Sequence, residues 1–255
     1  MTGGVLGDKI HVDMAKVLKK TGSLFKALLD VLLPPVCYVC RESCSGKYGL
    51  CEVCIAKIRY IPYPHCLKCG RRLANKETLC RECASKKSPL ERGWSCCYYE
   101  GTIKECIHLF KYNRYIGLID VFRDIAVNFI RKNNIAKKVD LIVPVPLHPA
   151  KRRGRPYNHA EVFASSVAKV IAIPADLKNL KKIKWTESQS ELNKDKRLEN
   201  VKESFLAVDK NSFSGRNVLL VDDVYTTGAT INECAKALLD ANANKVFSLT
   251  LARGV

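Results

Sequence analysis

Four cysteine pairs in the first third of the chain limit its possible folds more than any other feature of the sequence. Each pair has two residues between its cysteines, and the pairs form two repeats with the same ten-residue gap. This spacing lets both thiolates of a pair reach one tetrahedral zinc ion at about 2.3 Å, and a second pair closes the site. We therefore predict two structural zinc ions in tandem zinc ribbons; interleaved pairing and a single occupied site are the alternatives. The predicted ligands are Cys37, Cys40, Cys51, Cys54, Cys66, Cys69, Cys80 and Cys83.

The other five of the 13 cysteines lack this spacing. Cys44 lies close enough to Cys40 to compete as a ligand, but it has no partner in the repeat. The remaining four stand in apolar strand-like or helical stretches, so we predict buried free thiols there. They are Cys96, Cys97, Cys106 and Cys234. Because the ribbon segment is short and has few large apolar residues, we expect it to fold only with metal bound.

A second motif lies near the carboxyl terminus, where an apolar run ends in two acids. Residues 218–221 are apolar without alternation, which fits a strand covered on both faces, as in a parallel sheet. Asp222 and Asp223 follow, and they repel each other unless a cation or a hydrogen-bond donor lies between them. A ribose diol supplies such donors, and a hydrated divalent cation supplies both donors and positive charge.

The loop after the acids offers backbone amides, hydroxyls and a glycine that tolerates positive φ, just before a helix predicted over residues 231–240. A phosphate in this loop meets oriented amides and the positive end of the helix. The motif therefore predicts a sugar-phosphate site; the alternative is an ordinary strand end followed by a Thr-capped helix. The loop consists of Thr226, Thr227, Gly228, Ala229 and Thr230.

Composition and charge narrow the function further. The chain has 255 residues and a formal net charge of +18, which points to a polyanionic partner or a very anionic substrate. Two zinc–thiolate sites would lower this charge to about +14. The apolar stretch at residues 24–36 is interrupted by Lys26, Asp30 and two prolines, and is shorter than the roughly 20 residues of a membrane span. We expect a cytoplasmic protein without a transmembrane segment.

The middle of the chain alternates between strand and helix patterns. We expect strands over residues 95–100, 141–143, 175–180 and 245–253, and helices over 102–111, 117–132 and 161–171. The acid-tipped strand, its helix and the last strand form a βαβ unit, so the fold class is α/β with a parallel sheet flanked by helices. Residues 181–202 are polar with little pattern, and such long loops are functional lids or disordered segments.

A basic segment follows the strand at 141–143. A stiff turn over residues 144–149 leads into four cations, which suit a pyrophosphate and a nucleic-acid backbone equally well. A solvated basic turn is the alternative. The four cations are Lys151, Arg152, Arg153 and Arg155.

Residues 218–230 are similar to the phosphoribosyl pyrophosphate (PRPP) motif of type I phosphoribosyltransferases. The resemblance implies that Asp222 and Asp223 hold the ribose hydroxyls and that the loop 226–230 wraps the 5-phosphate, with Mg²⁺ accompanying PRPP. It also implies that the loop after residue 143 takes the pyrophosphate. Residues 184–200 would form a hood over the ligand, from which Arg197, with Lys196 behind it, reaches the leaving pyrophosphate.

The motif and the paired cysteines together resemble the ComF family of phosphoribosyltransferase-like competence proteins with an amino-terminal double zinc ribbon. The similarity covers nearly all of residues 32–253. ComF members usually have Arg-Gly-aromatic-Asn-Gln where this chain has residues 155–159, so Pro156 and His159 depart from the pattern. Pro156 stiffens the backbone and His159 changes the hydrogen bonds available to a ligand there.

The resemblance implies a cytoplasmic protein of natural transformation that handles single-stranded DNA beside a helicase-like partner. Two hypotheses stand: a DNA-uptake protein that binds single strands and keeps a PRPP site, which we favour, and an active Mg²⁺-dependent transferase with an unknown acceptor. A small-molecule-sensing regulator ranks lower, because no helix-turn-helix is recognisable. We divide the chain into an amphipathic helical segment (1–33), a double zinc ribbon (34–92) and a phosphoribosyltransferase-like domain (93–255).

Overall fold

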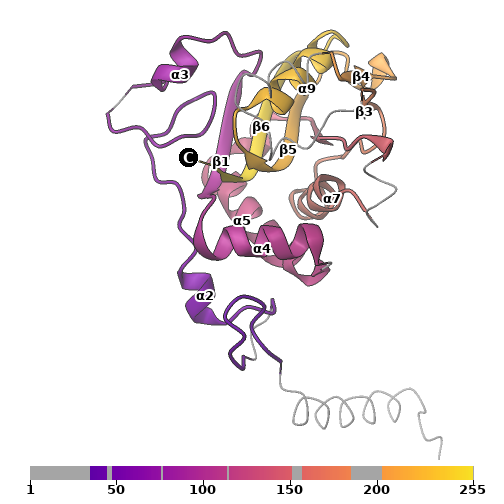
Figure 1. Cartoon of the computed structure of the whole chain (residues 1–255). Coiled ribbons are helices and arrows are strands. Elements are labelled where there is room, and N and C mark those ends of the chain that lie inside the picture. The colour runs from indigo at the N-terminus through magenta and orange to yellow at the C-terminus, as the bar shows by residue number, and fades with distance from the viewer. Residues whose placement is uncertain are drawn as a thin grey trace, which may run out of the picture. The chain divides into compact units, whose positions relative to one another are not determined.

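The structure, a computed structural model, describes residues 35–44, 48–75, 77–113, 115–150, 157–184 and 203–254 (Figure 1). The chain divides into two compact units, residues 1–51 and 52–255, and each is described by itself. Several predictions lie outside the described residues. These are the helical segment at 1–33, the hood residues from 185 onward with Lys196 and Arg197, and Pro156 with the cations Lys151, Arg152, Arg153 and Arg155.

A four-stranded parallel sheet forms the centre of the larger unit. Its order is β1 (Arg92–Tyr98), β6 (Lys245–Arg253), β5 (Asn217–Tyr225) and β2 (Leu141–Pro144), and every neighbouring pair is parallel. Residues 218–221 are fully buried, as expected for a central strand covered on both faces. The predicted α/β fold class and parallel sheet are confirmed.

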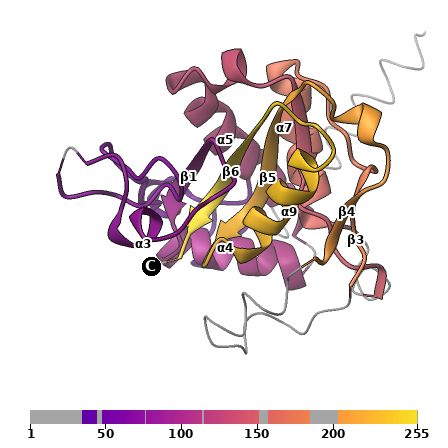
Figure 2. The same cartoon turned by 90° about the horizontal axis from the view of Figure 1, so that it is seen from above.

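Helices cover both faces of this sheet. α5 (Ile119–Lys132) and α7 (His159–Ile171) pack against each other and against the sheet, whereas α9 (Ala229–Leu239) covers the opposite face (Figure 2). α4 (Gly101–Tyr112) follows β1 directly. Each of these four helices presents a stripe of buried apolar residues at helical spacing, which explains why the sequence pattern located all four.

The predicted strand at residues 175–180 is wrong. Ala175 forms only an isolated bridge with Ile142, because the Asp176 carboxylate accepts hydrogen bonds from the backbone N–H groups of Lys178 and Asn179 and turns the chain. The strand begins later, as β3 (Leu180–Lys182), and pairs antiparallel with β4 (Phe205–Ala207) in a separate two-stranded sheet. β1 also begins three residues before its predicted start, at Arg92.

Small elements complete the described fold. Two short helices, α2 (Glu52–Ala56) and α3 (Arg81–Ala84), lie at the later cysteine pair of each repeat, and 3-10 turns span Ile116–Leu118, Ile135–Lys138 and Lys210–Ser212. Within the described ranges, every helix is too short or too polar to cross a membrane.

The second cysteine repeat belongs to the core of the larger unit. Cys66, Cys69 and Cys80 share one buried apolar cluster with α9 and with one face of the sheet. The Ser88 hydroxyl also donates to the side-chain oxygen of Asn232 on α9, at 3.1 Å. The ribbon around this repeat therefore packs directly on the helix that follows the acidic motif.

Candidate functional site

Strand β5 extends past its neighbour β2 and exposes one edge of its carboxyl end. The last β2–β5 pair is Pro144 with Val221, whereas β5 stays paired with β6 as far as Tyr225. We expected the strand to end before the acids; instead, Asp222 and Asp223 lie within it, in its last four residues. In open parallel sheets, the carboxyl ends of the strands are where ligands bind.

Burial and mutual repulsion perturb the two acids. Burial, followed by the negative charge of Asp223, raises the pKa of Asp222 to about 8, although Lys111 and the backbone N–H of Asp223 act in the opposite direction. That N–H donates to Asp222 Oδ1 at 2.8 Å. At neutral pH the pair therefore carries less than its full charge of −2, and a cation between the carboxylates would restore it.

Lys111 supplies the positive charge that the acid pair requires. Its Nζ lies 2.7 Å from Asp223 Oδ1, and both side chains are about four-fifths buried, with exposed fractions of 22% and 19%. Sequence reasoning missed this residue. The available signal was its position on the apolar stripe of α4, four residues after the buried Ile107 and one after Phe110. A lysine at such a position requires a buried partner.

The loop after β5 forms a narrow cup at the start of α9. Gly228 has a φ of +77°, and a Cβ added to it would lie 2.0 Å from the hydroxyl oxygen of Tyr225. Thr227 Oγ1 accepts a hydrogen bond from the backbone N–H of Ala229 at 3.3 Å. The cup has a volume of about 50 Å³ and is lined by Asp222, Val224, Tyr225, Thr226, Gly228, Ala229, Thr230 and Ile231.

The cup brings together Asp222 and most of the predicted loop residues. Its size suits a single phosphate group rather than a whole nucleotide, and α9 contributes its positive end to it. His159, whose effect on a ligand we questioned, is instead buried in an aromatic cluster, 5.1 Å between ring centroids from both Phe110 and Tyr157. The preceding Asn158 caps α7 by accepting from the backbone N–H of Ala160.

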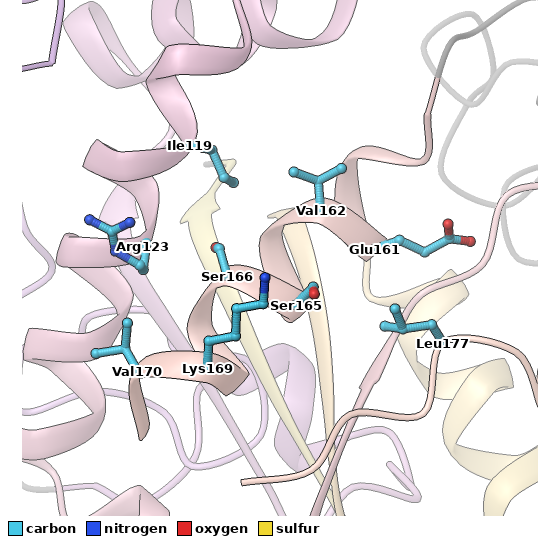
Figure 3. A pocket seen from close by; sticks show the side chains of 9 residues that line it. All are labelled: Ile119, Arg123, Glu161, Val162, Ser165, Ser166, Lys169, Val170 and Leu177. Atoms are coloured by element: carbon cyan, nitrogen blue, oxygen red, sulfur yellow. The ribbon is translucent and has the colours of Figure 1, made fainter. Parts of the chain in front are cut away.

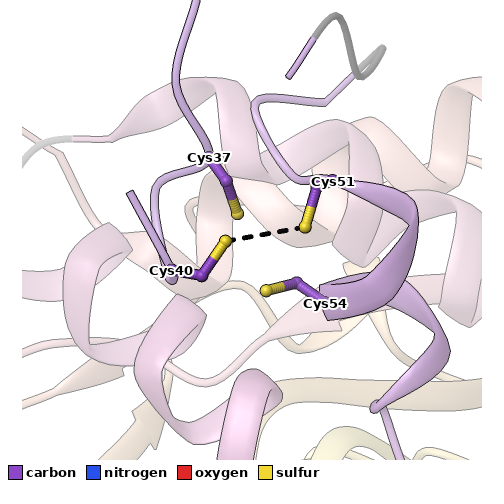
Figure 4. Close-up of side chains that lie close together, drawn as sticks. All are labelled: Cys37, Cys40, Cys51 and Cys54. Carbon is purple, nitrogen blue, oxygen red and sulfur yellow. Dashed lines mark hydrogen bonds between the residues drawn. The ribbon is translucent and has the colours of Figure 1, made fainter. Parts of the chain in front are cut away.

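The eight predicted cysteine ligands form two clusters of four, and in each cluster all four sulfurs lie within 4.8 Å of one another. Figure 4 shows the first cluster, Cys37, Cys40, Cys51 and Cys54. Sulfur–sulfur distances are 3.6 Å between Cys40 and Cys51 and 3.7 Å between Cys69 and Cys80. A zinc ion with four thiolates at about 2.3 Å has tetrahedral edges of about 3.8 Å, so both clusters fit it. The sequential pairing is confirmed. Cys44 belongs to neither cluster, and Cys96, Cys97, Cys106 and Cys234 are buried as predicted.

Arg253, at the end of β6, connects the second cluster to the cup. Its side chain is buried, Nη2 lies 3.6 Å from Cys69 Sγ, and the guanidinium carbon lies 5.2 Å from the centre of the Tyr225 ring. Tyr225 in turn fills the space beside Gly228. Because four thiolates and one Zn²⁺ leave a net charge of about −2, a buried guanidinium is a suitable counter-charge.

A larger hollow of about 550 Å³ lies between α5 and α7 (Figure 3). It does not combine acids and amides as the cup does. One of its two cations, Arg123, is already paired with Asp120 and with Asp124, the latter at 2.9 Å. Size alone therefore does not make it the functional site. The lining residues are Ile119, Arg123, Glu161, Val162, Ser165, Ser166, Lys169, Val170 and Leu177.

The parallel sheet, the acid pair with its loop and the two four-cysteine clusters define a phosphoribosyltransferase-like protein with a double zinc ribbon. Comparison with protein families identifies the same two domains, the zinc ribbon and the phosphoribosyltransferase domain. Residues 28–84 match the double zinc ribbon domain, and residues 156–254 match the phosphoribosyl transferase domain.

The chain belongs to the ComF family of competence proteins. It is 31% identical to competence protein F of Haemophilus influenzae over 223 residues, which cover 85% of this chain and 96% of that protein. It is 29% identical to competence protein ComFC of Bacillus subtilis over 212 residues, 80% of this chain and 84% of that protein. Membership in this family supports a competence-related function.

Part of the chain also aligns with a solved structure. A crystal structure of adenine phosphoribosyltransferase matches 53% of this chain and 71% of its own chain, with 17% identity and a TM-score of 0.34.

Proposed function

We propose that this protein is a cytoplasmic DNA-uptake protein that binds single-stranded DNA and carries a PRPP-binding site at the carboxyl end of β5. The observation that carries the PRPP part is the acid pair directly beside a phosphate-sized cup. The family membership and the net charge of +18 support the DNA part. A helicase-like partner remains an expectation from the family.

In this proposal each part of the site binds one part of PRPP. The amides and hydroxyls of residues 226–230 bind the 5-phosphate, and Asp222 and Asp223 accept hydrogen bonds from the ribose hydroxyls. Mg²⁺, when bound with PRPP, neutralises the pyrophosphate. Lys111 pairs with Asp223 at 2.7 Å and so holds this carboxylate in place as an acceptor for the ribose.

An active phosphoribosyltransferase is the second candidate, and the intact acid pair favours it. In such a reaction the bond between C1 of the ribose and the pyrophosphate oxygen breaks, pyrophosphate leaves, and an acceptor nucleophile attacks the same carbon. Catalysis would then be mainly electrostatic. Arg197, beyond the described residues, remains the residue that we predict to contact the pyrophosphate.

Thermal unfolding with and without ligand tests the PRPP site. We expect PRPP with Mg²⁺ to raise the melting temperature of the unmutated protein, and the double variant Asp222→Asn with Asp223→Asn to abolish that rise. Asp240→Asn, an exposed change at the far end of α9, is the matched control and should retain it. No rise in the unmutated protein would eliminate the PRPP proposal.

A turnover assay separates the two candidates. PRPP with Mg²⁺ would be incubated with the protein and a panel of nucleobases, and released pyrophosphate would be measured. Release that depends on one base and on Asp222 and Asp223 would favour the transferase. Ligand-induced stabilisation without release across the panel would favour the binding protein.

A further inference from the structure

A second charged hollow lies at the opposite edge of the sheet, at the amino ends of three neighbouring strands. β1 begins at Arg92, β6 at Lys245 and β5 at Asn217, so the sheet itself fixes the spacing of these three residues. We call this hollow of about 410 Å³ the amino-edge pocket. It is lined by Leu67, Glu91, Arg92, Lys138, Asn217, Asn244, Lys245 and Phe247.

Cations outnumber acids in the lining of this pocket. Arg92, Lys138 and Lys245 stand against Glu91 alone, and Glu91 pairs with Lys245 at 3.2 Å. Both members of that pair are about half exposed, so the pair is weak. Within the described part of the chain, Lys138 makes no ion pair. The lining therefore keeps a net positive charge.

Arg92 gives the strongest indication of a missing anionic partner. It is half-buried, its Nε is inaccessible to water, and this atom has no hydrogen-bond partner among the described residues. The guanidinium packs on the Trp94 ring, with its carbon 5.2 Å from the ring centre, and this contact satisfies no N–H group. Buried donors without partners are rare in folded proteins. Because Nε itself is closed to solvent, a ligand in the pocket would accept from the outer N–H groups of the Arg92 guanidinium.

Amide groups add neutral donors next to these cations. The Asn244 side chain donates to the side-chain oxygen of Asn217 at 2.9 Å, which leaves the amide nitrogen of Asn217 as a further donor. The nearby carboxylate of Asp140 is already engaged, because it accepts from the backbone N–H of Asn217 at 2.9 Å. A guanidinium, ammonium groups and amides together are the donors that proteins use for phosphate.

We propose that the amino-edge pocket binds a backbone phosphate of single-stranded DNA. The proposal rests on the proposed DNA-binding function and adds a location to it. The pocket and the PRPP cup lie at opposite ends of β5, roughly 25 Å apart for a nine-residue strand, so they are separate sites. A phosphate suits the pocket because its oxygens can accept from Arg92 and Lys138 at once.

Binding of a fluorescent oligothymidylate, measured by anisotropy across a salt series, tests this assignment. Each phosphate contact contributes about −0.7 to the log–log salt slope for single strands. We expect the double variant Arg92→Gln with Lys138→Gln to reduce the slope by about 0.7 and to weaken binding about 5-fold at 0.1 M salt. Each single variant should account for part of that loss. Lys245→Gln should cost less, because Glu91 already partners that lysine.

Lys104→Gln is the matched control. It removes one exposed charge from α4, which follows the carboxyl end of β1, and it should leave the slope unchanged if DNA contacts the pocket specifically. Lys138 is exposed on a 3-10 turn, so its variant remains informative if Arg92→Gln disturbs the packing on Trp94. Melting temperatures of all variants would verify folding.

The outcomes separate this proposal from the DNA-binding function on which it rests. Unchanged slopes in both Arg92→Gln and Lys138→Gln, or an equal loss in Lys104→Gln, would overturn the pocket while DNA binding stands. No binding by the unmutated protein would overturn both. Inorganic phosphate is a second probe: protection from unfolding at constant ionic strength, lost in Arg92→Gln but without any oligonucleotide binding, would assign the pocket to free phosphate and refute the DNA role.

Discussion

At the residue scale, Asp222 links protonation to folding and to ligand binding. Its pKa is raised from 3.8 to about 8, first by burial and then by the neighbouring Asp223. Between these two values the folded state holds a proton that the unfolded state releases. The free energy of unfolding contributed by this group is therefore fully present below pH 4 and is lost as pH rises through 8.

We predict that Asp222→Asn flattens the pH dependence of stability between pH 5 and 8 and makes the protein more stable than the unmutated form above pH 8. Urea unfolding across this range, compared between the two proteins, measures the effect, because other titrating groups cancel in the difference. Parallel pH profiles for the two proteins would contradict the assignment. Saturating Mg²⁺ with PRPP should lower the apparent pKa, since a cation favours the ionised carboxylate.

Gly228 is the residue whose substitution should disturb the cup most. An alanine there would need a left-handed backbone, and its Cβ would lie 2.0 Å from the Tyr225 hydroxyl oxygen. We expect Gly228→Ala to lower the free energy of unfolding by about 2–4 kcal/mol. Gly215→Ala is a matched control, with a φ of +70° and no atom within 4 Å of the added Cβ. It should cost only about 1 kcal/mol, and equal losses by denaturant titration would refute the steric argument.

At the scale of elements, the end of β6 joins the second cysteine cluster to the loop before α9. Arg253 contacts Cys69 on one side and the Tyr225 ring on the other, and its Nη1 donates to the carbonyl oxygen of Gly254 at 2.8 Å. Removing the guanidinium should leave the zinc–thiolate charge without its buried partner. The segment around Cys69 and the loop before α9 should then become less ordered together.

We predict that Arg253→Gln makes the second cluster lose zinc to a chelator at least 10-fold more readily and weakens the stabilisation by PRPP. Zinc content per chain and chelator competition measure the first effect independently of any ligand. Arg131→Gln, an exposed change in the last turn of α5, serves as the control. Unaltered zinc retention in Arg253→Gln would show that its contact with Cys69 contributes nothing to metal binding.

The elements were predictable wherever burial leaves a periodic signal in the local sequence. The apolar run at residues 218–221 predicted a central strand, and the spacing of cysteines predicted both metal clusters. The antiparallel pair of β3 and β4 was missed because two of the three residues of β3 are lysines and its partner lies 23 or more residues away. Its pairing depends on tertiary packing that a local pattern does not record.

The site was predictable only in its contiguous parts. The acids and the loop occupy one stretch of sequence, whereas Lys111 lies 112 residues from Asp223, and Arg253 lies 184 residues from Cys69. Lysines and arginines are abundant in this chain, so no single one signals a buried partner. Only the folded structure shows that these two of the 43 lysines and arginines have buried partners.

At the scale of the whole molecule, the two cysteine clusters differ in how they are buried. Cys40 of the first cluster is exposed, whereas three cysteines of the second are buried and belong to the core shared with α9. Zinc in the second cluster therefore stabilises the larger unit, and its release requires that core to open. The first cluster has a more accessible sulfur for a chelator.

We predict that a chelator titration releases zinc in two phases, about one ion in each. The first phase should leave the main thermal transition within about 3 °C of its starting value, and the second should coincide with its loss. A colorimetric zinc reporter and thermal unfolding, followed on the same samples, measure both. Cys37→Ser should remove the fast phase only, and a single phase of two ions would contradict this order.

The buried contact between Arg253 and Cys69 also has an evolutionary consequence. A lineage that lost the cysteines of the second cluster would inherit an arginine at position 253, buried beside Tyr225, with no thiolate to balance its charge. Such descendants should have replaced that arginine with a neutral side chain, or moved a carboxylate into the former position of the sulfur. We therefore expect Arg253 and the cysteines of the second cluster to be lost together in the same lineages.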